Sequence, residues 1–186
     1  MKNIESLIKG LIAEIGENPD REGLKNTPER VAKSWDYFSS GYRINIEDIV
    51  NGAIFEEDIS EVVVVRDIEF FSICEHHLIP FFGRCHVGYL PDGKIIGLSK
   101  IPRIVDAFSQ RLQIQERLTH QIADTINEVL NPVGVAVVME GRHLCMQMRG
   151  VEKQNSFATS SAMLGQFRDS PETRAEFLSI IGMDKI

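Results

Sequence analysis

Apolar residues recur every three or four positions along residues 3–16, a spacing that predicts an amphipathic helix. The stripe consists of Ile4, Leu7, Ile8, Leu11, Ile12 and Ile15. A second helix is predicted from Thr27 to about Ser39. Thr27 is expected to cap its free N–H groups, and Pro28 suits the first helical position.

A change in the types of residue along the chain marks a second, larger domain. Residues 42–57 are polar and are typical of a connector, which predicts an N-terminal helical region at 1–57 and a second domain at 58–186. β-branched and aromatic residues after position 60 predict strands. The expected elements are strands at 61–71, 82–90 and 94–98, helices at 100–112 (capped by Ser99) and 115–130, a hairpin of 133–140 with 143–149 about Gly141, a weak strand within 152–162, and a helix after Ser170. Because strands and helices come in blocks, the predicted fold is α+β with an antiparallel sheet.

Composition and charge narrow the function classes. Of the 186 residues, 43% are apolar and 25% are charged, and the net charge is −7. This acidic balance argues against a nucleic-acid binder or a basic membrane-surface protein. No apolar run approaches the ~18 residues of a transmembrane helix, and the acidic N-terminal segment does not fit a signal peptide. The three cysteines argue against a disulfide framework, so we expect a reducing cytoplasm.

Metal-ligating residue types lie in two strand-like segments. Cys74 and His77 have a Cys-x-x-His spacing, and Cys145 follows in a distant segment. Three such ligands leave a fourth tetrahedral position for water, as in catalytic zinc sites. His76 and His143 lie beside them and could move protons. Two buried apolar cysteines would explain the same residues without a metal, and the spacing leaves both interpretations open.

Basic residues at a predicted helix start indicate an anion site. Lys100 and Arg103 fall in the first turn after Ser99, where cations disfavour the helix itself but a bound anion would be stabilised. Arg149 follows Cys145 closely and could add a charge. No P-loop motif is present. Solvated basic side chains remain the alternative.

A carboxylate begins the predicted helix at 115–130. Glu116 could accept two parallel hydrogen bonds from the Watson–Crick edge of a guanine. From this position alone, stabilisation of the helix N-terminus by an acidic side chain is the favoured explanation.

Several motifs occurring together resemble the GTP cyclohydrolase I family, the zinc enzymes that open pteridine biosynthesis. The stretches are SICEHHLIPFFG (72–83), YLPDGKIIGLSKIPRIVDAFSQRLQIQERLT (89–119) and RHLCMQMRGVEKQNS (142–156), with TPERVAKSW (27–35) and MLGQFRDSPETRAEFL (163–178) in support. Joint occurrence of CEHH, GLSK-x-x-R, QERLT and HLCM-x-x-RG is far more specific than any one of them. The resemblance covers nearly the whole chain from about residue 20.

The resemblance implies a role for each candidate residue. Zinc would be held by Cys74, His77 and Cys145, while His76, His143 and Ser99 would be catalytic, with Ser99 beside the ribose. Glu116 would hold the guanine edge and Gln115 would also contact the substrate. The triphosphate would be bound by Lys100, Arg103 and Arg149, with Arg30 reaching in from a neighbouring subunit.

The resemblance also implies a fold, an assembly and a reaction. The 58–186 domain would be a catalytic tunnelling-fold domain, with a sheet covered by helices on one face and strands that join across subunits into a barrel. A homodecamer is implied, and the apolar strands 61–71 and 133–139, which are unsuited to exposed edges, independently indicate association. A chain with so few strands also cannot close a barrel alone. The implied reaction opens GTP hydrolytically at C8, releases formate and cyclises the product to 7,8-dihydroneopterin triphosphate, the first step towards tetrahydrofolate and pterins.

Other functions compete with this interpretation. A zinc-dependent nucleotide hydrolase could stop after ring opening, and a structural zinc protein would leave GTP intact. A zinc deaminase is disfavoured because the chain lacks a His-x-Glu and Pro-Cys-x-x-Cys pair. A pyruvoyl-tetrahydropterin synthase is disfavoured because the zinc site of that family has three histidines, which the segments CEHH and HLC do not fit.

Overall fold

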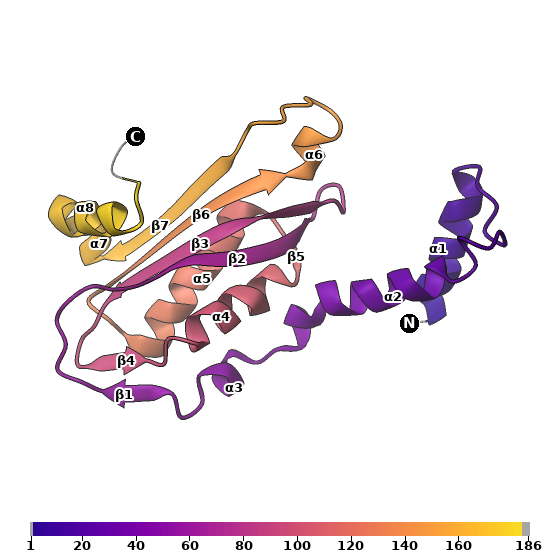
Figure 1. The fold of residues 1–186 in the computed structure, drawn as a ribbon. Coiled ribbons are helices and arrows are strands. Elements are labelled where there is room, and N and C mark those ends of the chain that lie inside the picture. The colour runs from indigo at the N-terminus through magenta and orange to yellow at the C-terminus, as the bar shows by residue number, and fades with distance from the viewer. Residues whose placement is uncertain (1, 184–186) are drawn as a thin grey trace. The chain divides into compact units, whose positions relative to one another are not determined.

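The computed structural model describes residues 2–183 and divides the chain into two compact units, Met1–Ser40 and Gly41–Ile186 (Figure 1). Residues 1 and 184–186, at the outer ends of the two predicted domains, lie outside the described range. The predicted division after residue 57 stays a prediction.

The first unit contains the two predicted helices, α1 (Lys2–Glu14) and α2 (Thr27–Phe38). They pack on each other around Ile12 and Ala32, which are buried. The predicted cap is wrong by one residue. Asn26 is the N-cap and its carbonyl accepts the first helical bond from Arg30 N–H at 3.2 Å, so Thr27 is already the first helical residue.

The predicted polar connector carries structure of its own. It contains a 3-10 turn, η1 (Ser40–Arg43), a short helix, α3 (Ile46–Val50), and a strand, β1 (Ile54–Glu56), which pairs with β4 (Lys94–Ile96). Apolar residues of α3 pack against the main core of the second unit. A few apolar residues are enough to hold α3 in place, because the core of the second unit supplies the apolar surface against which they are buried.

A five-stranded sheet organises the second unit, in the order β5-β2-β3-β6-β7. Its strands are β2 (Val63–Cys74), β3 (Pro80–Leu90), β5 (Leu112–Gln113), β6 (Gly134–His143) and β7 (Ala158–Gly165). All neighbours pair antiparallel except β2 with β5, which are parallel. The predicted α+β class with an antiparallel sheet is confirmed.

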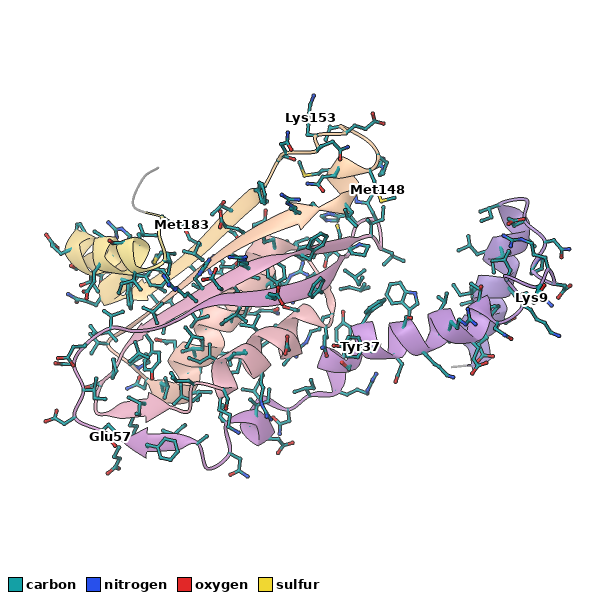
Figure 2. All side chains as sticks on the ribbon, viewed as in Figure 1. Lys9, Tyr37, Glu57, Met148, Lys153 and Met183 are labelled. Atoms are coloured by element: carbon teal, nitrogen blue, oxygen red, sulfur yellow. The ribbon has the colours of Figure 1, made fainter. Side chains whose placement is uncertain are left out.

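Helices cover the sheet on the face that carries most of the core. The amphipathic helices α4 (Lys100–Ser109) and α5 (Gln115–Leu130) bury residues such as Ile104 and Ile122 against it, and side chains fill the space between (Figure 2). The C-terminal helices α7 (Gln166–Asp169) and α8 (Pro171–Ile180) bury Phe167 and Phe177 against Ala136 and Val138 on the opposite face.

The predicted hairpin about Gly141 is wrong. β6 runs straight through Gly141 to His143 and is followed by a short helix, α6 (Leu144–Gln147). Gly141 serves close packing rather than a turn, because a Cβ there would clash with the side-chain oxygen of Gln115.

β6 is also not a sheet edge, because β3 and β7 flank it, so the edge argument made for 133–139 is wrong. Its apolar run reflects burial on both faces. The argument holds for β2, which has only two β5 residues, Leu112 and Gln113, beside it on its outer side.

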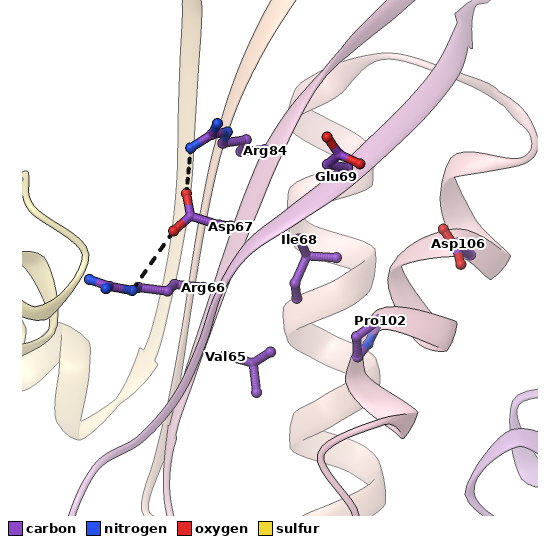
Figure 3. Close-up of a pocket in the computed structure, with 8 residues that line it drawn as sticks. All are labelled: Val65, Arg66, Asp67, Ile68, Glu69, Arg84, Pro102 and Asp106. Atoms are coloured by element: carbon purple, nitrogen blue, oxygen red, sulfur yellow. Dashed lines mark hydrogen bonds and ion pairs between the residues drawn. The ribbon is translucent and has the colours of Figure 1, made fainter.

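A β-bulge interrupts β2 between Val65 and Ile68, with Asp67 at a positive φ of 58°. The bulge directs Asp67 towards Arg84, whose Nη1 donates to its carboxylate at 2.8 Å (Figure 3). The Asp67 N–H donates to Nδ1 of the buried His86 at 3.1 Å. The hollow beside this bulge contains none of the predicted site residues.

Candidate metal centre

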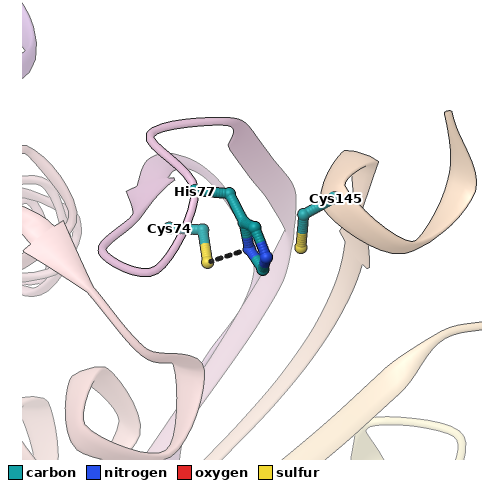
Figure 4. Close-up of side chains that lie close together, drawn as sticks. All are labelled: Cys74, His77 and Cys145. Carbon is teal, nitrogen blue, oxygen red and sulfur yellow. Dashed lines mark hydrogen bonds between the residues drawn. The ribbon is translucent and has the colours of Figure 1, made fainter. Parts of the chain in front are cut away.

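Cys74, His77 and Cys145 lie together at one end of the sheet. One ligand atom from each falls within 4.8 Å of the others, and Cys74 Sγ is 3.9 Å from Nδ1 of His77 (Figure 4). Cys74 ends β2, His77 is in the turn before β3, and Cys145 is in α6. The antiparallel pairing of Phe81 with His143 brings the distant segment alongside the turn.

The turn that carries His77 is held by its backbone and by one ion pair. Cys74 N–H donates to Ile79 O at 3.0 Å, and Leu78, at a positive φ of 54°, donates back to Cys74 O at 2.9 Å. Glu75 forms two contacts with Arg117 of α5, at 2.5 and 3.1 Å. The hydrogen bond from Arg117 lowers the pKa of the Glu75 carboxyl below its usual range. The turn is therefore tied to α5 by the Glu75–Arg117 pair.

The thiols form an environment that favours a cation. Burial raises the pKa of the Cys145 thiol, the neighbouring Cys74 adds to that rise, and the charge of Arg149 opposes it. Two thiolates this close repel each other unless a positive ion lies between them. Two Zn–S bonds of about 2.3 Å at a tetrahedral angle span about 3.8 Å, which suits a group of this size. Thiolate and imidazole ligands also match zinc chemically, so the residues present fit a zinc ion.

His143 is positioned by contacts on two sides. Its ring stacks on Phe81 at 4.6 Å between centroids with an interplanar angle of 9°, and its Nε2 lies 2.8 Å from Oε1 of Gln115. Burial lowers the pKa of His143, and the nearby Glu116 carboxylate opposes that shift. His76 is exposed next to His77, with the two rings nearly perpendicular at 6.2 Å.

Two of the predicted phosphate-binding residues, Lys100 and Arg103, are not at this end of the sheet. Lys100 and Arg103 lie in the first turn of α4, whereas β5, just beyond the other end of α4, pairs with Cys74 (Figure 1). Ten residues of helix span about 15 Å. Ser99 is the N-cap of α4, as predicted, but its side chain caps no N–H group.

The other predicted substrate residues divide between the metal end of the sheet and the first unit. Glu116 is exposed at the start of α5, and Arg149 is exposed in the segment after α6, where Met148 and Lys153 also lie (Figure 2). Both are at the metal end of the sheet. Arg30 is exposed on α2 in the first unit.

Comparison with known proteins identifies the family. The model of the family described as GTP cyclohydrolase I matches residues 4–182. The chain belongs to the GTP cyclohydrolase I family. It is 59% identical over 178 residues to the GTP cyclohydrolase 1 of Leptospira biflexa, covering 96% of this chain and 97% of that protein. It is also 59% identical over 179 residues to that of Methylococcus capsulatus, covering 96% and 97%. The Drosophila melanogaster protein is 59% identical over 171 residues, covering 92% of this chain and 53% of the longer relative.

Membership of the GTP cyclohydrolase I family decides between the two interpretations of the cysteines. The family is zinc-dependent, and the three grouped side chains can bind a metal, so zinc is the cofactor. The tunnelling-fold class expected for a single subunit of this family is likewise confirmed. The described part of the chain contains no helix long and apolar enough to cross a membrane.

Sequence reasoning missed two contacts that organise this GTP cyclohydrolase I site. The Glu75–Arg117 pair joins residues 42 apart, and the Gln115–His143 bond joins residues 28 apart. Neither spacing has a local signature. Only the pairing of β2 with β5 and of β3 with β6 brings these residues together.

Proposed function

We propose that this chain is a zinc-dependent GTP cyclohydrolase I that opens GTP at C8, releases formate and forms 7,8-dihydroneopterin triphosphate. The observation that carries this function is the Cys74–His77–Cys145 group within a chain matched over residues 4–182 by the family model. Three ligands leave room for water at the metal, which fits catalysis better than a structural role.

The residues of the metal centre would have separate roles in the reaction, metal binding for three of them and proton transfer for two. Zinc held by Cys74, His77 and Cys145 would supply a water with a pKa lowered towards about 7. His143 and His76 would accept and return protons as the imidazole ring of the purine opens and formate leaves. His143 is half-buried against Phe81, so its imidazole is held while the exposed His76 can follow the substrate.

Substrate contacts would orient the purine and its phosphates. The Glu116 carboxylate would accept two hydrogen bonds from the guanine edge, and Ser99 would lie beside the ribose. Lys100, Arg103, Arg149 and Arg30 would bind the triphosphate. The triphosphate takes no part in the chemistry, so the contribution of these four basic side chains is positioning.

One site built from these residues requires more than one subunit. The length of α4 separates Lys100 and Arg103 from the metal ligands of the same chain. A neighbouring subunit that presents its own α4 start to this metal centre would complete the site. The open outer side of β2 and the edge strand β7 offer unpaired backbone groups for joining sheets between subunits. We propose a homo-oligomer, and specifically the decamer that the resemblance to the family implies. We also propose a reducing cytoplasmic location, which suits three free cysteines.

The deciding experiment is incubation of the zinc-loaded protein with GTP, following formate release and pterin fluorescence after oxidation. One equivalent of each per GTP supports the proposal. Formate without a pterin would indicate a hydrolase that stops after ring opening. Tightly held zinc with intact GTP would indicate a structural zinc protein.

A further inference from the structure

Gln115 is buried and its side chain is fully engaged by the protein. Its exposed fraction is 2%. The amide nitrogen has two hydrogens to share among three acceptors, Met139 O at 3.1 Å, Ala158 O at 2.8 Å and the Ser160 hydroxyl at 3.1 Å. The amide oxygen faces Nε2 of His143 at 2.8 Å. These contacts use both the donor and the acceptor end of the amide, so little capacity is left for a ligand.

The surroundings of this amide fix which end is which. Met139 O and Ala158 O are carbonyl oxygens that only accept, so the atom facing them must be the –NH₂ group. The other end, facing His143, is therefore the oxygen. An oxygen accepts only, so Nε2 of His143 must carry the hydrogen. In neutral imidazole this leaves the lone pair on Nδ1.

Other contacts hold the same arrangement in place. Phe81, which is fully buried, stacks on His143 and fixes the plane of the imidazole. Gly141 leaves the space that the Gln115 oxygen occupies, since a Cβ there would clash with it. Thr119 bonds Ser160 at 2.7 Å and so supports one of the acceptors of the amide. Stacking and the hydrogen bond together restrict both tilt and rotation of the ring.

We infer that Gln115 is a positioning residue for His143 rather than a substrate contact, and that His143 presents Nδ1 to the reacting purine. This inference rests on the proposed function and replaces the substrate role that the resemblance implied for Gln115. A neutral amide suits the task, because it selects one tautomer without adding a charge beside the zinc ligands.

The first test is a double-mutant cycle in the zinc-loaded protein. Gln115→Met keeps side-chain volume but removes the hydrogen bond, and kcat should fall about 10–100-fold with zinc content retained. The Kd for GTP should change less than about threefold, because the side chain does not touch substrate. In a His143→Ala background the same substitution should cause no further loss of kcat. A weakening of GTP binding by the same factor in both backgrounds would overturn the inference.

Gln113→Met is the matched control for the loss of a buried glutamine. Gln113 is also 2% exposed, and its amide bonds Phe108 O at 3.0 Å and Gln121 at 2.8 Å without touching His143. It should lower the melting temperature as Gln115→Met does, yet keep kcat. Equal kcat losses in the two variants would show that Gln115 has a structural role only, and would overturn the inference. If Gln115→Met does not fold, Gly141→Ala displaces the amide oxygen instead and should produce the same kcat defect.

A spectroscopic test needs no turnover. Long-range ¹H–¹⁵N spectra of the zinc-loaded protein at about pH 8, where an ordinary imidazole is neutral, should show His143 as the Nε2–H tautomer. In Gln115→Met the signal should shift towards a tautomer mixture. An Nδ1–H tautomer in the unmodified protein would overturn the inference. Failure of the unmodified protein to consume GTP would count against the proposed function only. The tautomer of His143 could still be measured, because the spectra do not depend on turnover.

Discussion

Glu75 and Arg117 form a two-point ion pair, with Nη1 of Arg117 2.5 Å from Oε2 of Glu75 and Nη2 3.1 Å from Oε1. Glu75 lies between Cys74, a member of the candidate metal group, and His76, and Arg117 follows Glu116 on α5. The pair therefore connects the segment that carries Cys74 and His77 to the start of α5, which carries Glu116, the carboxylate that we propose binds guanine.

Replacing Arg117 with Lys should lower kcat/KM by about tenfold or more, because small misplacements of reacting groups are costly and a lysine cannot make the two-point contact. Melting temperature should hardly change, since both side chains are partly exposed. Steady-state kinetics with zinc content checks this. Exchanging the charges, Glu75→Arg with Arg117→Glu, should recover part of the loss. The exposed Lys9–Asp20 pair, at 2.9 Å, supplies a control, and a kinetic defect in Lys9→Ala as large as in Arg117→Lys would contradict the positioning role.

Each chain should hold one zinc ion through two thiolates and one imidazole. Cys145→Ser should remove most of the zinc and abolish turnover, because a hydroxyl is a poor zinc ligand beside Cys74 and His77. Metal analysis after gel filtration and a GTP assay measure both effects. Cys85→Ala is the control, since Cys85 is fully buried in the core away from the cluster. Full zinc and normal activity in Cys145→Ser would show that the ligand set is misassigned.

Active sites shared between subunits should allow complementation. A mixture of Arg103→Ala and Glu116→Ala proteins, dissociated and reassembled, should regain activity above either parent. If Arg103 and Glu116 of one site come from different chains, about a quarter of the sites in an equal mixture carry neither substitution. Cys145→Ser mixed with Glu116→Ala is the control that should not recover, because both residues lie at the metal end of one chain. Recovery in neither mixture, with subunit exchange demonstrated, would count against shared sites.

His86 should make the fold less stable in mild acid. Burial lowers the pKa of His86 below its usual 6.5, while Asp67 and Glu140 oppose that shift and Arg84 and Arg66 add to it. The unfolded chain then takes up a proton as pH falls through 6.5, whereas the folded chain takes it up only at lower pH. Stability is thus complete above 6.5 and declines through the window between the two values.

Melting temperature followed from pH 8 to about pH 5 tests this decline. His86→Asn should flatten it, because the Asn oxygen can still accept the Asp67 N–H but does not titrate. His120→Asn, on the exposed side of α5, should leave the profile unchanged. An unchanged acid slope in His86→Asn would rule out His86 as its source.

The sequence determined the elements whose periodicity is strong. Helix α5 begins and ends where its apolar stripe and Asn131 predicted, because repeated apolar positions and a left-handed Asn cap act locally. The α+β class followed from the order of these elements, and the zinc group followed from its ligand types and the family motifs. Cysteine and histidine chemistry is a property of residue type, so it can be recognised before the fold is known.

Only the tertiary structure decided how β6 ends and what Gln115 does. Gly141 has turn chemistry in the sequence, but burial between β3 and β7 keeps the strand straight and leaves its space to the Gln115 oxygen. The partners of Gln115 are 24 to 45 residues away, so no local pattern encodes them. The separation of Lys100 from the metal centre likewise depends on the direction of α4 across the sheet. Local propensity selects helices and strands, whereas register and packing decide which side chains meet.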